Sequence, residues 1–238
     1  MTTIADFKVK LFADGADKAG MLEMYRKPFV KGFTTNPTLM RQAGLTDYEA
    51  FARDILAAVP YHPFSLEVFS DDFDEMVEQA RQLASWGENV YVKIPVTNTR
   101  GESSAKVIRT LVDDGVKLNV TALMTLRQVH VVAESMAGTS SGFVSVFAGR
   151  IADAGVDPVP VMAAAVEILS AYQGLELIWA SPREILNLIQ ADAVGCHIIT
   201  VTHDLLKKVG SIGRDLDDFS LATVRMFHDD AAAAGYRL

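Results

Sequence analysis

Residues 89–97 read NVYVKIPVT, and this stretch points to the fold more clearly than any other. β-Branched and aromatic residues dominate it and polar residues bound it, which is typical of a buried β-strand. Apolar residues stand on both sides of Lys93, as expected for a strand of a parallel sheet, which other elements cover on both faces. Because burying a charged ammonium is costly, the position of Lys93 calls for a chemical reason.

Similar apolar segments recur along the chain. We expect strands at 7–12, 32–35, 64–68, 90–94, 116–120, 142–146, 175–180 and 197–201. Between them, apolar residues at spacings of three and four predict helices at 48–59, 73–86, 104–115, 126–138, 158–173, 181–195 and 202–210. In the helix predicted at 181–195, Ser181 is expected as the N-cap and Pro182 as the first helical residue.

The regular alternation of strand and helix decides the fold class. It predicts an α/β protein with parallel strands joined by right-handed crossovers. Eight such units in 238 residues fit a closed (β/α)8 (TIM) barrel, with residues 1–238 forming one domain. The alternative is an open doubly wound sheet, which is disfavoured because no glycine-rich turn follows the first strand. Residues 219–236 predict an extra C-terminal helix that caps the barrel or docks on a neighbouring subunit.

Composition narrows the class of protein. The net charge is −8 and no basic run or helix is present, which argues against a nucleic-acid partner. No apolar run reaches the roughly 18 residues of a membrane span, so no membrane partner is expected. The first residues, MTTIADFKVK, lack the basic-then-apolar pattern of a signal peptide. Cys196 is the only cysteine, which suits a reducing cytoplasm.

Polar residues gather at the predicted C-terminal ends of the strands, where barrels of this kind carry their reactive groups. They are Asp14, Asn36, Glu67, Lys93, Asn119, Thr121, Ser145 and, shortly beyond strand six, Arg150. Each also has a structural interpretation. An Asn-Pro pair is often a turn, Ser and Thr often cap helices, and Glu or Arg often forms a surface ion pair. Lys93 itself could snorkel or form an ion pair.

A buried lysine also has a chemical use. Removal from water favours the neutral amine, which attacks carbonyl groups to form a Schiff base. The iminium then withdraws electrons from an adjacent C–C bond as that bond breaks. Such chemistry needs groups that move protons, which Glu67 and Thr121 can supply, with Asp14 as a second base.

Five ordered blocks resemble the transaldolase family, especially its small members, which include the fructose-6-phosphate aldolases. The blocks are FADGAD (12–17), GFTTNPTL (32–39), VYVKIPVT (90–97), LNVTALM (118–124) and FVSVFAGRI (143–151). The resemblance implies a class I aldolase barrel that works without a cofactor. It also implies a Schiff-base lysine on strand four, at Lys93.

The resemblance also implies a role for each matching residue. Glu67 and Thr121 hold a water that moves protons, and Asp14 takes the proton of the sugar C4 hydroxyl. The hydroxyls of the dihydroxyacetone unit are held by Asn36, Asn119 and Ser145. Arg150 faces the far, phosphate-bearing end of the sugar, with Phe147 lining the pocket nearby. Glu67 and the Asn119/Ser145 pair look like the transferase branch, since the aldolase branch typically has glutamine at the first place and lacks that asparagine.

The chain departs from the family pattern at two places. After strand seven, relatives read like ASF followed by a basic residue that helps grip phosphate, whereas this chain reads IWASPREIL (178–186). Ser181 and Arg183 remain as candidates there, with Arg183 expected in the first turn of the helix. In addition, Gly15 stands where relatives tend to carry threonine or alanine.

Three functional hypotheses remain open. The first is a transaldolase that moves a dihydroxyacetone unit from a ketose to an aldose. The second is an aldolase that releases free dihydroxyacetone, and the third is a non-catalytic barrel that binds sugars. The expected ligand is a small sugar or sugar phosphate, and the expected assembly is a homo-oligomer. A metal site at His197 and His203 is disfavoured because no third ligand has matching spacing.

Overall fold

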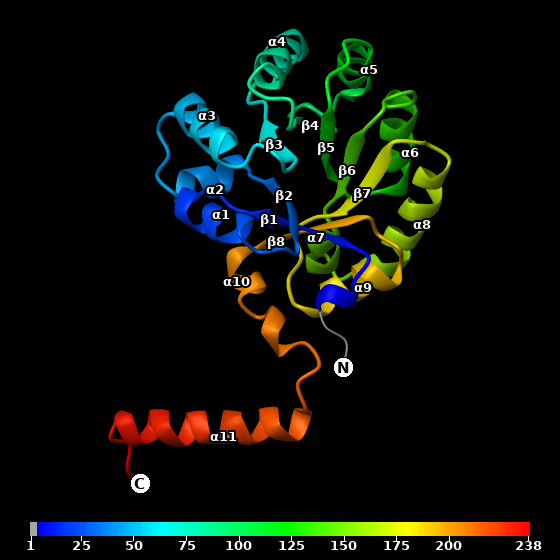
Figure 1. The fold of residues 1–238 in the computed structure, drawn as a ribbon. Coiled ribbons are helices and arrows are strands. Elements are labelled where there is room, and N and C mark those ends of the chain that lie inside the picture. The colour runs from blue at the N-terminus through cyan, green and yellow to red at the C-terminus, as the bar shows by residue number, and fades with distance from the viewer. Residues whose placement is uncertain (1–3) are drawn as a thin grey trace.

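The computed structural model describes residues 4–238, and its centre is a closed barrel of eight parallel strands (Figure 1). Each strand pairs with the next, and β1 closes the ring by pairing with β8. The predicted (β/α)8 barrel is thereby confirmed, and the open sheet is wrong. The strands are β1 (Lys10–Asp14), β2 (Val30–Thr34), β3 (Phe64–Glu67), β4 (Val90–Pro95), β5 (Leu118–Leu123), β6 (Gly142–Val146), β7 (Leu175–Trp179) and β8 (Ile198–Thr202).

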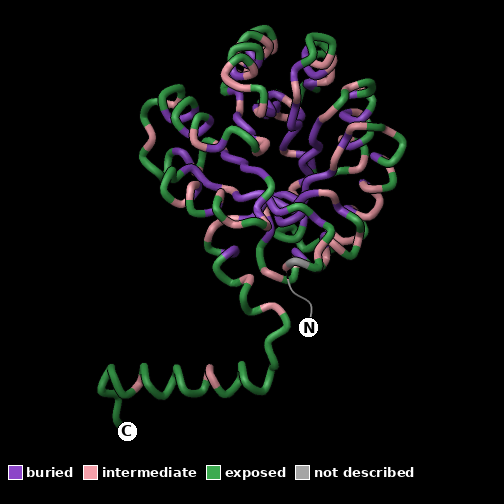
Figure 2. The backbone as a smooth tube through the Cα atoms, in the orientation of Figure 1, coloured by how far each residue is buried: buried purple, intermediate pink, exposed green. Residues whose placement is uncertain are grey.

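Helices surround the barrel and bury their apolar faces against the strands (Figures 1 and 2). They are α1 (Lys18–Tyr25), α2 (Pro37–Gln42), α3 (Tyr48–Ala58), α4 (Phe73–Ala84), α5 (Ala105–Asp113), α6 (Leu126–Ser135), α7 (Ala148–Asp153), α8 (Pro158–Ser170), α9 (Leu186–Ala193) and α10 (His203–Leu206), with short 3₁₀ turns η1 (Ile4–Asp6) and η2 (Val209–Ser211). The sequence did not predict α1, α2 and α7. These helices have six to eight residues, which is too short for a clear amphipathic period.

The expected start of α9 is wrong. Ser181 has a positive φ of 61° and lies outside the helix, which begins at Leu186. Arg183 therefore does not sit in a first helical turn. Its backbone N–H donates to Asn187 Oδ1 at 2.7 Å, so the segment before α9 is held by a side chain of the helix.

The barrel interior is built in two layers. Aromatic and aliphatic side chains fill the lower layer, where the Tyr91 and Phe143 rings stack at 4.1 Å and Phe12 meets Phe143 edge-on at 5.6 Å. Side chains two residues apart on a strand share a face. The residues two positions further along these strands therefore form the next layer, and they are Asp14, Lys93 and Ser145. The polar layer thus rests on an apolar floor at the C-terminal ends of the strands.

The last helix, α11 (Leu216–Ala233), projects away from the barrel (Figures 1 and 2). It does not cap the barrel, and none of its residues is buried. Leu216, Phe219, Met226 and Phe227 are all exposed and recur on one face at helical spacing. Of the two expected roles for this helix, only docking on another subunit is compatible with its position.

Among residues 4–238, no helix is both long enough and apolar enough to span a membrane.

Candidate active site

A cavity of about 450 Å³ opens at the C-terminal ends of the strands. It is lined by all eleven side chains that the sequence singled out, namely Asp14, Asn36, Glu67, Lys93, Asn119, Thr121, Ser145, Phe147, Arg150, Ser181 and Arg183. They come from five strands, namely β1, β3, β4, β5 and β6, from the segments that follow β2, β6 and β7, and from α7. The fold therefore gathers these residues into one pocket, while the role of each stays a prediction.

Lys93 lies deep in this pocket, with only 6% of its surface exposed. Its Nζ forms an ion pair with Glu67 Oε2 at 2.8 Å and donates to the Thr35 carbonyl oxygen at 2.8 Å. The ion pair follows from the strand register, because Glu67 and Lys93 are direct partners across β3 and β4. The sequence allowed Lys93 to snorkel or to form an ion pair, and the structure shows the ion pair.

The pair has a simple consequence for reactivity. Transfer of one proton across the 2.8 Å contact from Lys93 to Glu67 gives an amine and a carboxylic acid, without placing a lone charge in the pocket. In this form the Lys93 amine can act as a nucleophile, and Glu67 holds the proton 2.8 Å away.

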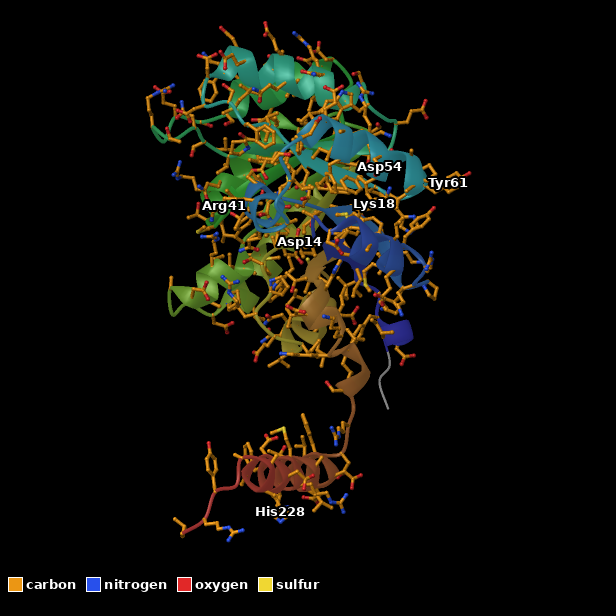
Figure 3. The ribbon with its side chains drawn as sticks, turned by 90° about the vertical axis from the view of Figure 1, so that its left-hand side faces the viewer. Asp14, Lys18, Arg41, Asp54, Tyr61 and His228 are labelled. Atoms are coloured by element: carbon orange, nitrogen blue, oxygen red, sulfur yellow. The ribbon has the colours of Figure 1, made fainter. Side chains whose placement is uncertain are left out.

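Asp14 ends β1 near the centre of the barrel (Figure 3). Its Oδ1 accepts a hydrogen bond from Thr34 Oγ1 at 2.7 Å, and Thr34 Oγ1 is in turn 2.5 Å from Thr200 Oγ1. Burial raises the pKa of Asp14, although the nearby Lys93 charge and the Thr34 hydrogen bond oppose that effect. A carboxylate with a raised proton affinity is suited to accepting a proton from a substrate hydroxyl.

Asn119 and Ser145 form a fixed polar pair on β5 and β6. Ser145 Oγ donates to Asn119 Oδ1 at 2.7 Å, and Asn119 Nδ2 donates to Ser65 Oγ at 3.0 Å. These three side chains are buried, so the hydrogen bonds hold the Asn119 amide in one orientation. A pre-oriented amide and hydroxyl can recognise sugar hydroxyls with little loss of side-chain entropy.

Thr121 stands where β5 becomes irregular. The pairing of β5 with β6 shifts register between Val120 and Leu123, and Ala122 adopts a positive φ of 65°. Thr121 Oγ1 is buried without a hydrogen-bond partner among the described residues. Such an unpaired hydroxyl costs free energy unless a ligand or a water binds it.

In residues 4–238, the two non-glycine positions with positive φ, Ala122 and Ser181, both line this cavity.

Asn36 serves a structural role as well as lining the pocket. Its Oδ1 accepts from the Leu39 backbone N–H at 3.0 Å and thereby caps α2, with Pro37 following at the start of the helix. The Asn36-Pro37 pair is therefore a helix start, and not the turn considered from the sequence. The Nδ2 group of Asn36 is the donor that remains for a substrate hydroxyl.

The far end of the cavity carries two arginines. The Arg150 guanidinium lies 5.7 Å from the centre of the Phe147 ring. Arg183 forms a two-pronged ion pair with Asp153, whose Oδ1 accepts from Arg183 Nε at 3.0 Å. Arg183 holds the pKa of Asp153 below its usual range. Part of the Arg183 charge is thus already balanced, which leaves Arg150 as the better placed cation for a substrate anion.

Close packing fixes this end of the pocket. A β-carbon on Gly149 would lie 1.6 Å from the Ser181 carbonyl oxygen, so only glycine allows the loop after β7 to approach α7 this closely. Thr34, Thr35, Ser65 and Asp153 contact the predicted site residues but were missed from the sequence, as was Thr200, which contacts Thr34. Strand pairing would have revealed Thr34, because it is the register partner of Asp14.

Two sequence features outside the pocket have structural roles. Asp72 caps the N-terminus of α4, and Asp71 accepts hydrogen bonds from Thr99, so the acidic run at 71–75 stabilises local structure. His197 Nδ1 accepts from the Leu177 N–H at 3.1 Å. Within residues 4–238, no three His, Cys, Asp or Glu side chains converge in a way that could hold a metal ion.

Comparisons with known proteins extend the structural result. The family model described as Transaldolase/Fructose-6-phosphate aldolase matches residues 11–237. A probable transaldolase from Dehalococcoides mccartyi is 35% identical over 203 residues, covering 84% of this chain and 90% of the relative. A probable transaldolase 2 from Listeria monocytogenes is 37% identical over 205 residues, covering 85% and 89% of the two chains.

Among solved structures, 3-keto-L-gulonate-6-phosphate decarboxylase from Vibrio cholerae superposes with a TM-score of 0.55 at 10% identity. The superposition covers 82% of this chain and 88% of the other. At such low identity the likeness concerns the barrel fold alone.

Proposed function

The chain belongs to the transaldolase/fructose-6-phosphate aldolase family, and on that premise we propose that it is a Schiff-base transaldolase acting through Lys93. It would transfer a dihydroxyacetone unit from a ketose, or a ketose phosphate, to an aldose acceptor. The observation that carries the proposal is the buried Lys93–Glu67 pair, within electrostatic reach of Asp14 and at the end of an open cavity. Among the described residues that line the cavity, Lys93 is the one that carries an amine nucleophile.

The first step forms the imine. Lys93 passes a proton to Glu67, and the neutral amine attacks the C2 carbonyl carbon of the ketose. The resulting hydroxyl group leaves as water when Glu67 returns the proton to it. The unpaired hydroxyl of Thr121 is suited to holding that water during its formation and departure. The product is a protonated imine that links Nζ of Lys93 to C2 of the sugar.

The second step breaks the C3–C4 bond. Asp14 takes the proton of the C4 hydroxyl, the C4 oxygen becomes an aldehyde, and the electrons of the broken bond move into the iminium to give an enamine. The Asn119–Ser145 pair would hold hydroxyls of the three-carbon unit while the aldose leaves. The proton now rests on Asp14, whose raised pKa suits it to keep that proton until the next step.

The third step runs in the opposite direction with a new aldehyde. Enamine C3 attacks the acceptor carbonyl carbon, and Asp14 returns its proton to the oxygen that becomes the new C4 hydroxyl. Water then adds to the imine and releases the product ketose, which restores the Lys93–Glu67 pair. No proton is gained or lost over the cycle, so Asp14 and Glu67 suffice as carriers.

An assay with paired substrates tests this proposal. Phosphorylated and free ketoses are incubated with the protein, with and without an aldose acceptor, and the products are identified by chromatography. Turnover that requires the acceptor supports the transferase, whereas release of dihydroxyacetone without an acceptor identifies the aldolase. Absence of both reactions, together with saturable sugar binding, would identify a non-catalytic barrel and overturn the proposal.

Substitution of Arg150 tests the orientation of the sugar in the cavity. We expect Arg150→Ala to raise KM for phosphorylated substrates by about 10- to 100-fold, since a charge-assisted contact contributes roughly 1.5–3 kcal/mol. Arg183→Ala should have a smaller effect, because Arg183 is already paired with Asp153. Steady-state kinetics on matched phosphorylated and free sugars measure the difference. Equal losses for both sugars would contradict a phosphate at this end.

The exposed α11 leads us to propose a homo-oligomer. No residue of α11 is buried by the described residues, 4–238, and exposed apolar faces of this kind usually mark interfaces. We expect light scattering after size exclusion to give a mass that is a multiple of 25.9 kDa. A variant with Phe219→Ser and Phe227→Ser should shift toward the monomer. A monomeric full-length protein at micromolar concentration would rule this assembly out.

A further inference from the structure

Tyr48 contacts the end of β3, at the point where Glu67 enters the pocket. The pairing of β2 with β3 reaches Ser65, which is the partner of Thr34. On the other side of β3, the pairing with β4 continues to Glu67 and Lys93. The backbone of Glu67 therefore lies beyond the last residue pair of β2 and β3, although it is still paired with β4.

The Tyr48 hydroxyl takes the place that a strand partner would occupy on that side. Tyr48 Oη accepts a hydrogen bond from the Glu67 backbone N–H at 3.0 Å and donates to the Glu67 carbonyl oxygen at 3.4 Å. One hydroxyl thus serves both polar groups of the Glu67 backbone. Only the neutral phenol can accept and donate at once. Burial raises the pKa of Tyr48, so the hydroxyl keeps its proton at neutral pH.

The ring that carries this hydroxyl is itself held in place. Tyr48 is the first residue of α3, and the N-cap Asp47 accepts from the Ala50 N–H at 2.9 Å. The Tyr48 ring meets the Phe69 ring edge-on, with 4.7 Å between the ring centres, and its centre lies 6.0 Å from that of Trp86. The hydroxyl is therefore presented to β3 by a capped helix and two aromatic contacts.

Open space on both sides of Glu67 makes this anchor important. Glu67 lines the catalytic cavity and also a second cavity of about 240 Å³. Tyr48, Trp86 and residues of α4 line the second cavity as well, and α3 and α4 are neighbours around the barrel (Figure 1). A strand end beside open space moves more easily than one that is closely packed. Pairing with β4 and the Tyr48 hydroxyl thus share the task of fixing the Glu67 backbone.

We propose that Tyr48 is a positioning residue that keeps the Glu67 carboxylate within proton-transfer distance of Lys93. The described residues that line the catalytic cavity do not include Tyr48, so it acts through Glu67 and touches no substrate. This inference rests on the proposed function, in which a proton moves between Lys93 Nζ and Glu67 Oε2 across 2.8 Å. A misplacement of about 1 Å at a reacting group can lower a rate by on the order of 100-fold.

Tyr48→Phe removes the hydroxyl and keeps the ring. Without substrate, NMR should show exchange of the Glu67 N–H with deuterated solvent at least about 10-fold faster, because its acceptor is lost. The Val68 N–H, which donates to the Lys93 carbonyl oxygen at 3.2 Å, should change by less than about 2-fold. Rapid mixing with a ketose and a borohydride quench should show imine formation slowed by roughly 3- to 10-fold, as expected for one lost hydrogen-bonding group.

A matched control and a double-mutant cycle locate the effect. Tyr172 is also partly buried against the core and lines neither cavity, so Tyr172→Phe should behave as wild type in both measurements. Glutamine at position 67 cannot carry a proton, so its exact placement no longer matters for proton transfer. Adding Tyr48→Phe to Glu67→Gln should therefore cause no further slowing of imine formation.

The outcomes separate this inference from the proposed function. A wild-type protein that traps no ketose would overturn the proposed function, and the role of Tyr48 with it. A wild type that traps the ketose, with Tyr48→Phe equally fast, would overturn the role of Tyr48 alone. Unchanged exchange of the Glu67 N–H would do the same. So would a lower melting temperature together with equal slowing in the wild-type and Glu67→Gln backgrounds, because Tyr48 would then act on stability and not through Glu67.

Discussion

Lys93→Met should abolish covalent capture of the ketose and lower kcat by on the order of 10⁴- to 10⁶-fold, as loss of an enzymatic nucleophile generally does. Wild-type protein incubated with a ketose and borohydride should gain one sugar-derived mass per chain, and peptide mapping should locate it on Lys93. The thioether of methionine cannot form an imine, so the variant should gain nothing. The physical reason is that the hydroxyl and carboxyl groups in the pocket can move protons but cannot form an imine with C2.

Control variants make this result interpretable. Lys106→Met removes an exposed lysine from α5 and should leave capture and turnover unchanged. Lys93→Met also leaves Glu67 without its ion-pair partner, which can destabilise a buried site by about 3–5 kcal/mol. Lys93→Arg keeps a cation opposite Glu67 while preventing imine formation, so it should be folded and inactive. A wild type without added mass, or a Lys93→Met variant with the same mass, would contradict the Schiff-base mechanism.

Asp14→Asn should separate imine formation from bond cleavage. The amide cannot accept the proton of the C4 hydroxyl, so we expect kcat to fall by about 10²- to 10⁴-fold, the usual contribution of a general base. Borohydride trapping of the donor ketose should persist, because that step uses Lys93 and Glu67. Single-turnover measurements of aldose release, beside the trapping yield, distinguish the two steps. Loss of both steps in a folded variant would contradict the assignment of Asp14 to cleavage.

The same substitution should raise stability. Burial raises the pKa of Asp14, so the folded state binds this proton more tightly than the unfolded chain does. Stability from this group is complete at low pH and is lost as the pH rises through the folded-state pKa. Asparagine cannot ionise, and the variant should gain roughly 0.5–2 kcal/mol in the free energy of unfolding at pH 8, a typical gain at a strained functional site.

Chemical denaturation at pH 4 and pH 8 measures this effect. The difference between Asp14→Asn and wild type should be larger at pH 8 than at pH 4. Asp204→Asn is a control in which the free energy of unfolding should change in the opposite direction. The reason is that the hydrogen bond and charge of Lys207 lower the pKa of the exposed Asp204 carboxylate. A variant that is destabilised at pH 8 would show that the contacts of Asp14 with Thr34 and Lys93 outweigh the cost of its burial.

The short helices and the loop before α9 show where sequence patterns could not predict the structure. The helices α1, α2 and α7 have too few residues to display a period, and α11 is amphipathic although none of its residues is buried in the described structure. The start of α9 was misplaced because Ser181-Pro182 resembles a helix start. There the closeness of Gly149 to the Ser181 carbonyl sets the backbone instead. Contacts between segments distant in the sequence overrode the local signal in that loop.

The sequence by itself determined the barrel and the identity of the polar groups at its mouth. Alternating strands and helices bury their apolar faces in few ways, and residues at strand ends meet once the ring closes. Only the tertiary structure decided how those groups act on one another. The Glu67–Lys93 ion pair, the Thr200–Thr34–Asp14 chain and the Tyr48 hydroxyl on the Glu67 backbone depend on the register between strands and on the packing between elements. These are properties of pairs distant along the chain, and hydrophobic period and local propensity carry no information about them.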